Sequence, residues 1–487
     1  MCGFCGIKYL TNSLFVEKEH LCRMNLKLTH RGPDSDGFYI TNECGLSFRR
    51  LAILDLSADG NQPMTNEDGS IWIVFNGEFY GFQKYREQLI KKGHTFKSKT
   101  DTETILHLYE EYGINCLQYI DGMFAFALWD NRNKQLYLVR DRLGIKPLYY
   151  YIDKEKIIFG SEIKAILEYP GIKKEINYQA LHNYLSFMTI PAPLTIYNNI
   201  YKLLPGNYLT HQNGNVITHE YWDLKEEEGD YNEKYYIEEL EVRFKKAVES
   251  YLISDVPIGA FLSGGVDSSA VVAMMSVILK SNVKTFSINF EGLNDYNEQK
   301  FSELVSSLYN TEHYTFNLKT DLISVLPKIV WYFDEPFAVS SAIGIYYLAK
   351  LAKEKITVAL TGDGADELFA GYPFRYSMDN RYKKISKIPK IMRNIFFRAL
   401  RLLPLLGNES QRNFVQKVKN YSKFFNGSQD DAFFNTYTFF DESINCEFHI
   451  TGYLWSPLVL VIIHNPQIRF SIHCDKRLSF LFSIQSN

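Results

Sequence analysis

Residues 261–269 read FLSGGVDSS, and this stretch decides how the second half of the chain folds. It joins a β-rich run, residues 256–262, to a helical pattern over residues 267–279, and a further β-rich run follows at 283–290. Strands that alternate with helices predict a doubly wound parallel sheet. The glycines and serines of the turn would gather backbone N–H groups and hydroxyls at a helix N-terminus, a geometry that binds phosphate.

A second glycine turn lies further along the chain. The run ITVAL at residues 356–360 is apolar and rich in β-branched residues, which is typical of a strand buried on both faces of a parallel sheet. It ends in the turn TGDGADELF, residues 361–369. The carboxylates of this turn could join Asp267 in holding magnesium against a bound phosphate group, and we expect Asp267 and Asp366 as the ligands.

The first half has a different pattern. Short β-rich runs such as residues 70–75 and 135–139, punctuated by Pro205-Gly206 and Asn213-Gly214, predict a layered α+β domain. The polar run at residues 225–230 is typical of a solvated connector. We therefore expect one domain over residues 2–222, a second over 232–440, and an atypical tail over 441–487.

Composition limits the classes of function. The chain has 487 residues, more than one hydrophobic core usually organises. Its 53 basic and 56 acidic residues give a net charge of −3, which supplies no basic field for nucleic acid and no polybasic membrane patch. The apolar stretch 453–463 would span only about 17 Å as a helix, too short for a bilayer. Seven cysteines without a secretory segment indicate reduced thiols, so we place the protein in the cytoplasm.

The chain opens Met1-Cys2-Gly3, and a small second residue permits removal of Met1. Cys2 would then carry both a thiol and a free α-amino group. With reference pKa values of about 8.5 for the thiol and about 7.7–8.0 for the amine, the amine can take the thiol proton. Two other readings stay open: an ordinary cysteine, and a Cys2-x-x-Cys5 redox or zinc pair, which lacks a matching second pair.

Five further motifs accompany Cys2 in a fixed order. They are HRGPD at 30–34, RLAILD at 50–55, NGE at 76–78, TDTE at 100–103 and RDRLGIKPLYY at 140–150. Together they resemble the class II glutamine amidotransferase domain, an N-terminal-nucleophile hydrolase, over residues 2–200. The resemblance implies an αββα sandwich and a nucleophilic attack by Cys2 on the glutamine side-chain amide.

The resemblance also assigns the groups that bind glutamine. Arg50, with its planar fork, would hold the α-carboxylate, and Ile53 would line the same pocket. Asp101 and Glu78 would accept the α-ammonium group. Asn76 and Gly77 are assigned to the same glutamine-binding site.

The same resemblance places an oxyanion hole at Asn76 and Gly77. The Asn76 side-chain amide and the Gly77 backbone N–H would stabilise the tetrahedral intermediate, and loss of one such donor costs about 100- to 1000-fold in rate. Taken alone, Asn-Gly is also a common hairpin turn. The family usually continues with Asn where this chain has Gly81, outside the assigned groups.

The FLSGGVDSS turn lacks the GxxxxGK[ST] spacing of a kinase-type P-loop and resembles the pyrophosphate loop of ATP pyrophosphatases. A simple helix N-cap is the alternative for this turn. Ile288 would lie along the adenine, although an ordinary core position is equally compatible. The resemblance assigns ATP contacts to Leu262, Ser263, Gly264, Gly265, Asp267, Ser268, Ser269, Ile288, Thr361, Gly362 and Asp363.

The order of these parts resembles glutamine-hydrolysing asparagine synthetase of the bacterial type over residues 2–440. That resemblance implies glutamine, aspartate and ATP as substrates, Mg²⁺ as the cation, an aspartyl-AMP intermediate, and an ammonia channel. A homodimer is kept as an open expectation. Two alternatives remain: the same mechanism on another carboxylate, such as a surface-polysaccharide sugar acid, and a non-catalytic remnant that binds glutamine or nucleotide. A sugar-isomerising amidotransferase would need a sugar-phosphate site in place of the pyrophosphate loop.

The chain departs from this family in two places. Thr361 stands where Ser is usual and Asp363 where Glu is usual, and the shorter carboxylate could signal a different acceptor acid. The tail from about residue 444 lacks the Lys-Asp-Arg-like and Glu-x-Arg-x-Pro-Phe-Leu-Asp segments of the family. We therefore expect glutaminase chemistry with impaired or absent amide synthesis.

Overall fold

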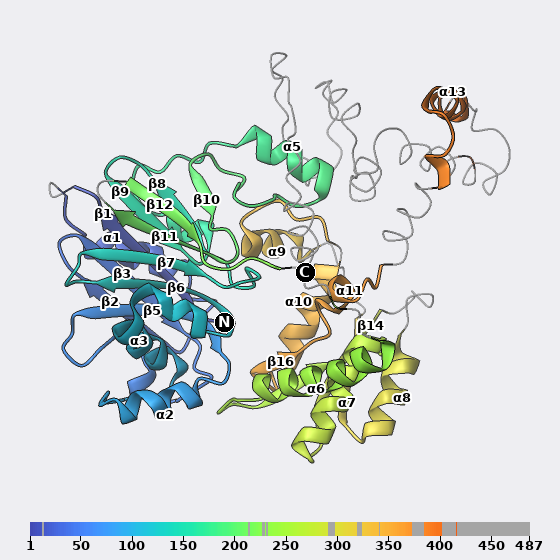
Figure 1. Cartoon of the computed structure of the whole chain (residues 1–487), viewed down its shortest axis with the longest axis horizontal. Coiled ribbons are helices and arrows are strands. Elements are labelled where there is room, and N and C mark those ends of the chain that lie inside the picture. Colours follow the sequence, from blue (N-terminus) through green and yellow to red (C-terminus); the bar gives the residue numbers. More distant parts are fainter. Residues whose placement is uncertain are drawn as a thin grey trace. The chain divides into compact units, whose positions relative to one another are not determined.

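The computed structural model describes the chain except residues 12–13, 213–214, 226–228, 230–231, 291–297, 319–323, 340, 373–383, 402–414 and 416–487 (Figure 1). The predicted turn at Asn213-Gly214, most of the connector and the whole tail lie outside the described residues. The chain forms two compact units. The first holds Met1–Asn177, Ala192–Glu335 and Ser340–Gly362, and the second holds Tyr178–Pro191, Pro336–Val339 and the chain from Asp363 onward.

Two antiparallel sheets organise the first half of the chain. One has the strand order β10-β8-β9-β1-β3-β2 and the other β12-β11-β7-β6-β5-β4. The strands of the first are β1 (Gly3–Tyr9), β2 (Ser35–Ile40), β3 (Cys44–Arg50), β8 (Tyr149–Ile152), β9 (Lys156–Gly160) and β10 (Ile200–Lys202). Those of the second are β4 (Met64–Thr65), β5 (Ile71–Phe79), β6 (Gly122–Asp130), β7 (Gln135–Arg140), β11 (Asn207–Gln212) and β12 (Asn215–Glu220).

The two sheets pack face to face. Phe4 and Phe159 of the first sheet and Val74, Ala127 and Trp129 of the second form one buried cluster. Because side chains alternate along a strand, the remaining apolar residues point outward and need a second cover. Each sheet therefore has two apolar faces.

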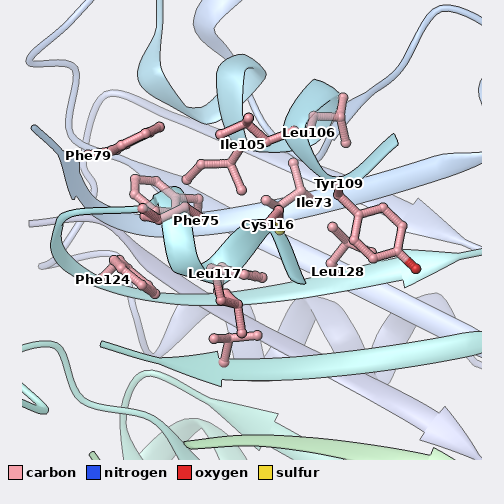
Figure 2. Packing of buried hydrophobic residues seen from close by; sticks show 14 of the residues in the cluster. Ile73, Phe75, Phe79, Ile105, Leu106, Tyr109, Cys116, Leu117, Phe124 and Leu128 are labelled. Carbon is pink, nitrogen blue, oxygen red and sulfur yellow. The ribbon is translucent and has the colours of Figure 1, made fainter. Parts of the chain in front are cut away.

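Helices provide that cover on both sides. The first sheet packs with α1 (Lys18–Leu26) and α4 (Ile163–Ile166). The second packs with α2 (Gln83–Lys91), α3 (Asp101–Tyr112) and the 3₁₀ segment η2 (Gly113–Tyr119). Figure 2 shows apolar side chains of α3 and η2 meeting those of β5 and β6. The layer order helix, sheet, sheet, helix confirms the predicted αββα sandwich.

The second half begins with α6 (Glu233–Tyr251) and contains a four-stranded parallel sheet of order β15-β14-β13-β16. Its strands are β13 (Ile258–Phe261), β14 (Lys284–Phe290), β15 (Glu312–Leu318) and β16 (Val358–Leu360), and its helices are α7 (Val266–Leu279), α8 (Gln299–Tyr309), α9 (Leu326–Phe333) and α10 (Ser341–Ala352). The prediction of a doubly wound parallel sheet is confirmed.

One detail of this sheet differs from the prediction. Leu360 is buried, but Val358 and Ala359 are only half-buried. The reason is that β16 is an edge strand among the described residues and pairs with β13 alone. An apolar run therefore need not be covered on both faces.

The second unit contributes α5 (Tyr178–Phe187), α11 (Ala365–Leu368) and α13 (Lys390–Arg401). Among the helices that the structure describes, none is both long and apolar enough to cross a membrane.

Candidate functional site

Cys2 lies directly before β1 and is held beside the end of β3. Its Sγ accepts a hydrogen bond from the Leu51 N–H at 3.4 Å and lies 3.5 Å from the Leu51 carbonyl oxygen. The Cys2 carbonyl oxygen accepts a hydrogen bond from Arg31 Nε at 2.8 Å. Burial raises the pKa of the Cys2 thiol, and the charge of Glu78 raises it further. The thiol therefore needs a base to become a nucleophile.

The Cys2-x-x-Cys5 pair is excluded by the strand geometry. Cys5 packs in the cluster between the first sheet and its helices, whereas Cys2 packs against the cluster between the two sheets. Residues three apart on a strand point to opposite faces, so the two sulfurs cannot share a metal or a disulfide. Both thiols are free.

Lys146 is a site residue to which the sequence gave no role. Its Nζ donates to the Met1 sulfur at 3.3 Å, and burial lowers its pKa to about 8. Burial, with the charges of Arg31 and Lys146, lowers the pKa of the Met1 α-amino group to about 5. A buried cation beside the start of β1 favours the thiolate form of Cys2. The only sequence signal for it is its place in the RDRLGIKPLYY run.

Asn76 and Gly77 lie within β5, so the alternative reading of a hairpin turn is wrong. Asn76 is 1% exposed, and its Nδ2 has no hydrogen-bond partner among the described residues. A buried N–H left unpaired costs about 1–3 kcal/mol, so such groups call for a functional explanation. A buried Nδ2 group without a partner among the described residues is consistent with the predicted role of Asn76 as an oxyanion donor.

The backbone of β5 supports the second donor. The N–H groups of Phe75 and Phe79 turn away from β6 and donate to Gln62 Oε1 at 2.6 Å and to Asp101 Oδ2 at 2.8 Å. Gly77 lies midway between them, and N–H directions repeat every two residues along a strand, so its N–H points to the same side. A Cβ on Gly77 would lie 2.3 Å from the Met123 carbonyl oxygen, which explains the glycine.

The half-buried Glu78 and the buried Asp101 form a pair of interacting carboxylates. Asp101 is the first residue of α3, and its two oxygens accept hydrogen bonds from the N–H groups of Phe79 and Thr102, each at 2.8 Å. Burial raises the pKa of Asp101 to about 6. Burial and then the charge of Asp101 raise the pKa of Glu78 to about 8. A ligand ammonium group beside them would offset both effects.

The affinity for glutamine is expected to rise with pH. Binding of an ammonium group favours the ionised carboxylates, and below pH 8 the Glu78 proton must leave first. The KM for glutamine should therefore fall between pH 6 and pH 8, by up to about tenfold per pH unit. Steady-state glutaminase assays across this range measure it. Glu78→Gln should flatten the dependence, and the exposed Glu87→Gln on α2 should leave it unchanged.

Arg50 is buried, and its guanidinium holds the loop that follows β3. Its two Nη atoms donate to the carbonyl oxygens of Leu54, Asp55 and Ser57 and to the side-chain oxygen of Asn61. A Cβ on Gly60, in the 3₁₀ turn Ala58–Gly60, would lie 2.1 Å from Nη2. A bidentate contact between Arg50 and a glutamine carboxylate would require the guanidinium to give up some of these hydrogen bonds. That contact therefore stays a prediction.

Two smaller expectations concern the same region. The carbonyl of Ile53 accepts a hydrogen bond from the Asp255 N–H at 3.0 Å, and its side chain is half-buried, so its role in the pocket stays a prediction. Gly81 has a φ of +67°, a backbone conformation that Gly and Asn both tolerate. The departure from Asn at this position therefore has a simple conformational explanation.

A chain of ion pairs runs from the Cys2 carbonyl to the end of α9. Arg31, which holds that carbonyl, pairs with Glu162 at 2.9 Å, and Glu162 also pairs with Lys164. Lys164 Nζ in turn lies 3.0 Å from Asp334 Oδ1, and its backbone N–H donates to Asp334 Oδ2 at 3.0 Å. These side chains are largely buried, so they are screened little by solvent.

Asp334→Asn is expected to lower the free energy of unfolding by about 1–3 kcal/mol, because Lys164 keeps one buried ionic partner but loses the other. Asparagine tolerates the positive φ of 63° at this position, which isolates the charge. Thermal unfolding of the full chain measures the loss. Asp36→Asn on the exposed side of β2 is the control, and equal midpoints for the two variants would contradict the prediction.

The FLSGGVDSS turn connects β13 to α7 as predicted. Ser263 Oγ lies 2.9 Å from Ser268 Oγ and accepts a hydrogen bond from the Gly265 N–H at 3.1 Å. The N-cap is Gly265, without a side-chain cap, so the simple N-cap reading by Ser or Asp is wrong. Ser269 Oγ is buried without a partner among the described residues. The turn thus keeps polar groups at a helix N-terminus, where phosphate binds favourably.

Glycines allow the close packing around this turn. Gly264 has a φ of +86°, and its Cβ would lie 2.5 Å from the Cβ of Phe301. A Cβ on Gly362, which follows β16, would lie 2.7 Å from the Ser268 N atom. Gly362 of the second glycine turn therefore lies against the FLSGGVDSS turn.

The remaining predicted nucleotide residues have separate positions. Ile288 is half-buried in β14, packed beside the Phe286 cluster, so the core reading holds and the adenine contact stays a prediction. Asp366 belongs to the second unit, where a Cβ on Gly371 would lie 1.8 Å from its Oδ1. Asp267 belongs to the first unit. The joint role of Asp267 and Asp366 as metal ligands stays a prediction. The ATP contacts expected for Leu262, Thr361 and Asp363 also stay predictions.

Comparison with known proteins identifies the family. A glutamine amidotransferase domain model matches residues 1–222, and an asparagine synthase model matches residues 239–446. The chain is 36% identical over 421 residues to glutamine-hydrolysing asparagine synthetase 1 of Bacillus subtilis, covering 83% of this chain and 64% of the relative. It therefore spans slightly less than two thirds of that relative's length.

A second relative is covered more fully. The putative glutamine-hydrolysing asparagine synthetase 2 of Methanocaldococcus jannaschii is 38% identical over 417 residues, which cover 81% of this chain and 79% of the relative. The chain therefore belongs to the family of glutamine-hydrolysing asparagine synthetases.

Proposed function

We propose that this protein hydrolyses glutamine at Cys2 and uses the ammonia and ATP to amidate aspartate. The observation that carries the proposal is the open Asn76 Nδ2 on the strand that also supplies Glu78, beside the buried Asp101. An oxyanion donor and an acceptor pair for an α-ammonium group are the two features that a γ-amide amino acid requires. The family membership supports the same reading.

The glutaminase step uses groups of this chain alone. After removal of Met1, the Cys2 α-amine takes the thiol proton, and the sulfur attacks the side-chain carbonyl carbon of glutamine. The oxyanion that forms receives hydrogen bonds from Asn76 Nδ2 and the Gly77 N–H. The protonated amine then gives its proton to the departing nitrogen, so ammonia leaves and a thioester remains. Water cleaves the thioester to glutamate.

In the synthetase step, the aspartate side-chain carboxylate attacks the α-phosphorus of ATP, and pyrophosphate leaves. Ammonia then attacks the acyl carbon of the aspartyl-AMP, and AMP leaves with the formation of asparagine. The turn at residues 263–265 and the N-terminus of α7 would hold the phosphates. Asp267 and Asp366 are hard oxygen ligands that suit Mg²⁺, which would neutralise phosphate charge when bound.

The names of the two relatives support aspartate as the acceptor and do not favour a sugar acid. A cytoplasmic location and a homodimer belong to the same proposal. The location is supported by free thiols at all five cysteines that the structure describes, as expected in a reducing compartment. Light scattering during size-exclusion chromatography measures the assembly.

The test incubates the purified full chain with glutamine, aspartate, ATP and Mg²⁺. Glutamate, asparagine, AMP and pyrophosphate are expected to accumulate together. Glutamate without pyrophosphate would reduce the function to a glutaminase and would support the expectation of an impaired synthetase half. Pyrophosphate that forms only when another carboxylate replaces aspartate would contradict the proposed acceptor. Mass spectrometry of the N-terminus should show that Met1 is absent.

A further inference from the structure

Four side chains outside the glutamine and nucleotide sites gather on the helical side of the second sheet. They are Glu67, His94, His107 and Glu110, and one nitrogen or oxygen atom of each lies within 4.8 Å of all the others. Glu67 follows β4, His94 follows α2, and the other two lie on α3. The cluster thus joins three segments that are separated in sequence.

Three distances between side chains of the cluster are close to those between the ligands of a small cation. Ligand atoms about 2.0–2.2 Å from a tetrahedral zinc ion lie about 3.3–3.6 Å from each other. Glu67 Oε1 lies 3.5 Å from His94 Nδ1, and the other oxygen of the same carboxylate, Oε2, lies 3.5 Å from His107 Nδ1. Glu110 Oε2 lies 3.6 Å from His94 Nδ1. The fourth contact, from His107 Nδ1 to Glu110 Oε2, is a 2.7 Å hydrogen bond that would lengthen by less than about 1 Å.

Outer partners orient the two carboxylates. The backbone N–H of Thr95 donates to Glu67 Oε1 at 3.0 Å, and Asn66 Nδ2 donates to Glu110 Oε1 at 2.7 Å. Each carboxylate keeps an oxygen directed at the histidines. Such outer hydrogen bonds fix ligand geometry in metal sites.

The histidines are arranged to bind through Nδ1. His94 Nε2 lies 3.1 Å from Glu111 Oε1, the carboxylate–histidine contact that fixes the tautomer of a metal ligand. His107 is 1% exposed, and its Nε2 makes no hydrogen bond among the described residues, with Glu103 Oε1 at 4.0 Å. If Nδ1 donates to Glu110 in neutral His107, Nε2 is a buried acceptor without a donor. If Nδ1 binds a cation, Nε2 carries the proton toward Glu103.

The charges around the cluster also favour a cation. The cluster contains two carboxylates, Glu67 and Glu110, and two more lie close to its histidines: Glu111 beside His94 and Glu103 beside His107. Lys92 pairs with Glu111, and Arg132 lies 3.7 Å from Glu110 Oε1 but pairs more closely with Asp68. The carboxylates therefore outnumber the permanently charged cations.

We propose that Glu67, His94, His107 and Glu110 bind a divalent transition-metal ion, with zinc the best fit to two imidazoles and two carboxylates. All four positions of a tetrahedral ion would be filled by protein, which is typical of structural rather than catalytic zinc. The ion would fix the loop after β4 and the connection between α2 and α3 to the helix that begins with Asp101.

The test uses the full chain, stripped with EDTA and returned to buffer with Mg²⁺ but without ATP. One zinc ion per chain is expected to bind, and Co²⁺ is expected to give the visible spectrum of a four-coordinate site without a thiolate charge-transfer band. Glu67→Gln and His94→Gln should each weaken zinc binding at least about tenfold. Glu17→Gln, beside His20 at 3.7 Å on the surface, is the matched control and should not change it.

Several results would overturn the proposal. The first is that the unchanged chain binds no more zinc than the Glu67→Gln chain. The second is a thiolate charge-transfer band with Co²⁺, and the third is a loss of zinc binding in Glu17→Gln as large as in Glu67→Gln. Since Glu67 is exposed, its variant should fold even if a His107 variant does not. The last comparison is the drop in thermal midpoint that Glu67→Gln causes relative to the unchanged chain, measured once with EDTA and once with zinc. An equal drop under both conditions would show that the cluster consists of ion pairs only, and would also overturn the proposal.

Discussion

Replacing Cys2 by alanine is expected to abolish glutamine hydrolysis and to leave ammonia-dependent asparagine formation nearly unchanged. The substitution removes the nucleophile, whose loss costs about 10⁶-fold in kcat in a well-studied hydrolase. A drop of at least about 10⁴-fold in glutamate production should follow. Ammonium chloride bypasses the first site, because free ammonia can attack the activated aspartate directly. The measurement is asparagine formation with glutamine and, separately, with ammonium chloride.

Cys5→Ala is the matched control for this experiment. Cys5 is the next cysteine in the chain and is buried on the opposite face of β1, where its sulfur contacts Ser47 Oγ at 3.0 Å. Glutamine hydrolysis should persist in this variant. Glutaminase activity that survives in Cys2→Ala, or that is lost equally in both variants, would reject Cys2 as the nucleophile.

Asn76→Ala should lower the kcat of glutamine hydrolysis by about 100- to 1000-fold. The Asn76 Nδ2 has no partner among the described residues, so its removal breaks no hydrogen bond within that part of the chain. Its donor is needed only when the oxyanion forms, so KM should change little. Thermal stability should also change less than for a partnered buried amide. Initial rates over a range of glutamine concentrations separate kcat from KM.

Asn25→Ala is the matched control, because it removes a buried asparagine amide to which no role in catalysis is assigned. Asn25 is equally buried, but its Nδ2 donates to the Phe48 carbonyl oxygen at 3.1 Å. This variant should lose stability and keep its kcat. If Asn76→Ala instead lost stability and kept kcat, the amide would be a structural group and the oxyanion hole would lie elsewhere.

Much of the fold could be predicted from the sequence because the signals are local. The strand, glycine turn and helix at residues 256–279 follow from hydrophobic periodicity and from the conformational freedom of glycine. Gly264, at a φ of +86°, occupies a conformation that favours glycine. The layers of the first half were expected from the resemblance, and the two sheets with their helices bear it out.

The partners of individual side chains could not be predicted in the same way. Asn76-Gly77 has the local sequence of a turn, yet pairing with β6 places it within a strand. The Arg50 motif predicted a guanidinium that is available to bind a carboxylate. In the structure this guanidinium instead donates hydrogen bonds to backbone carbonyl oxygens. Lys146 is one lysine among many until the fold buries it.

By itself, the sequence determined the types and order of the elements, the two glycine turns, and Cys2 as the candidate nucleophile. Only the tertiary structure decided that Cys2 and Cys5 are separated by a sheet, that Asn76 holds an open donor, and that Glu67 meets His94 and His107. The physical reason is range. Periodicity and backbone sterics act over a few residues and can be read along the chain, whereas these contacts depend on strand register and helix packing between distant segments.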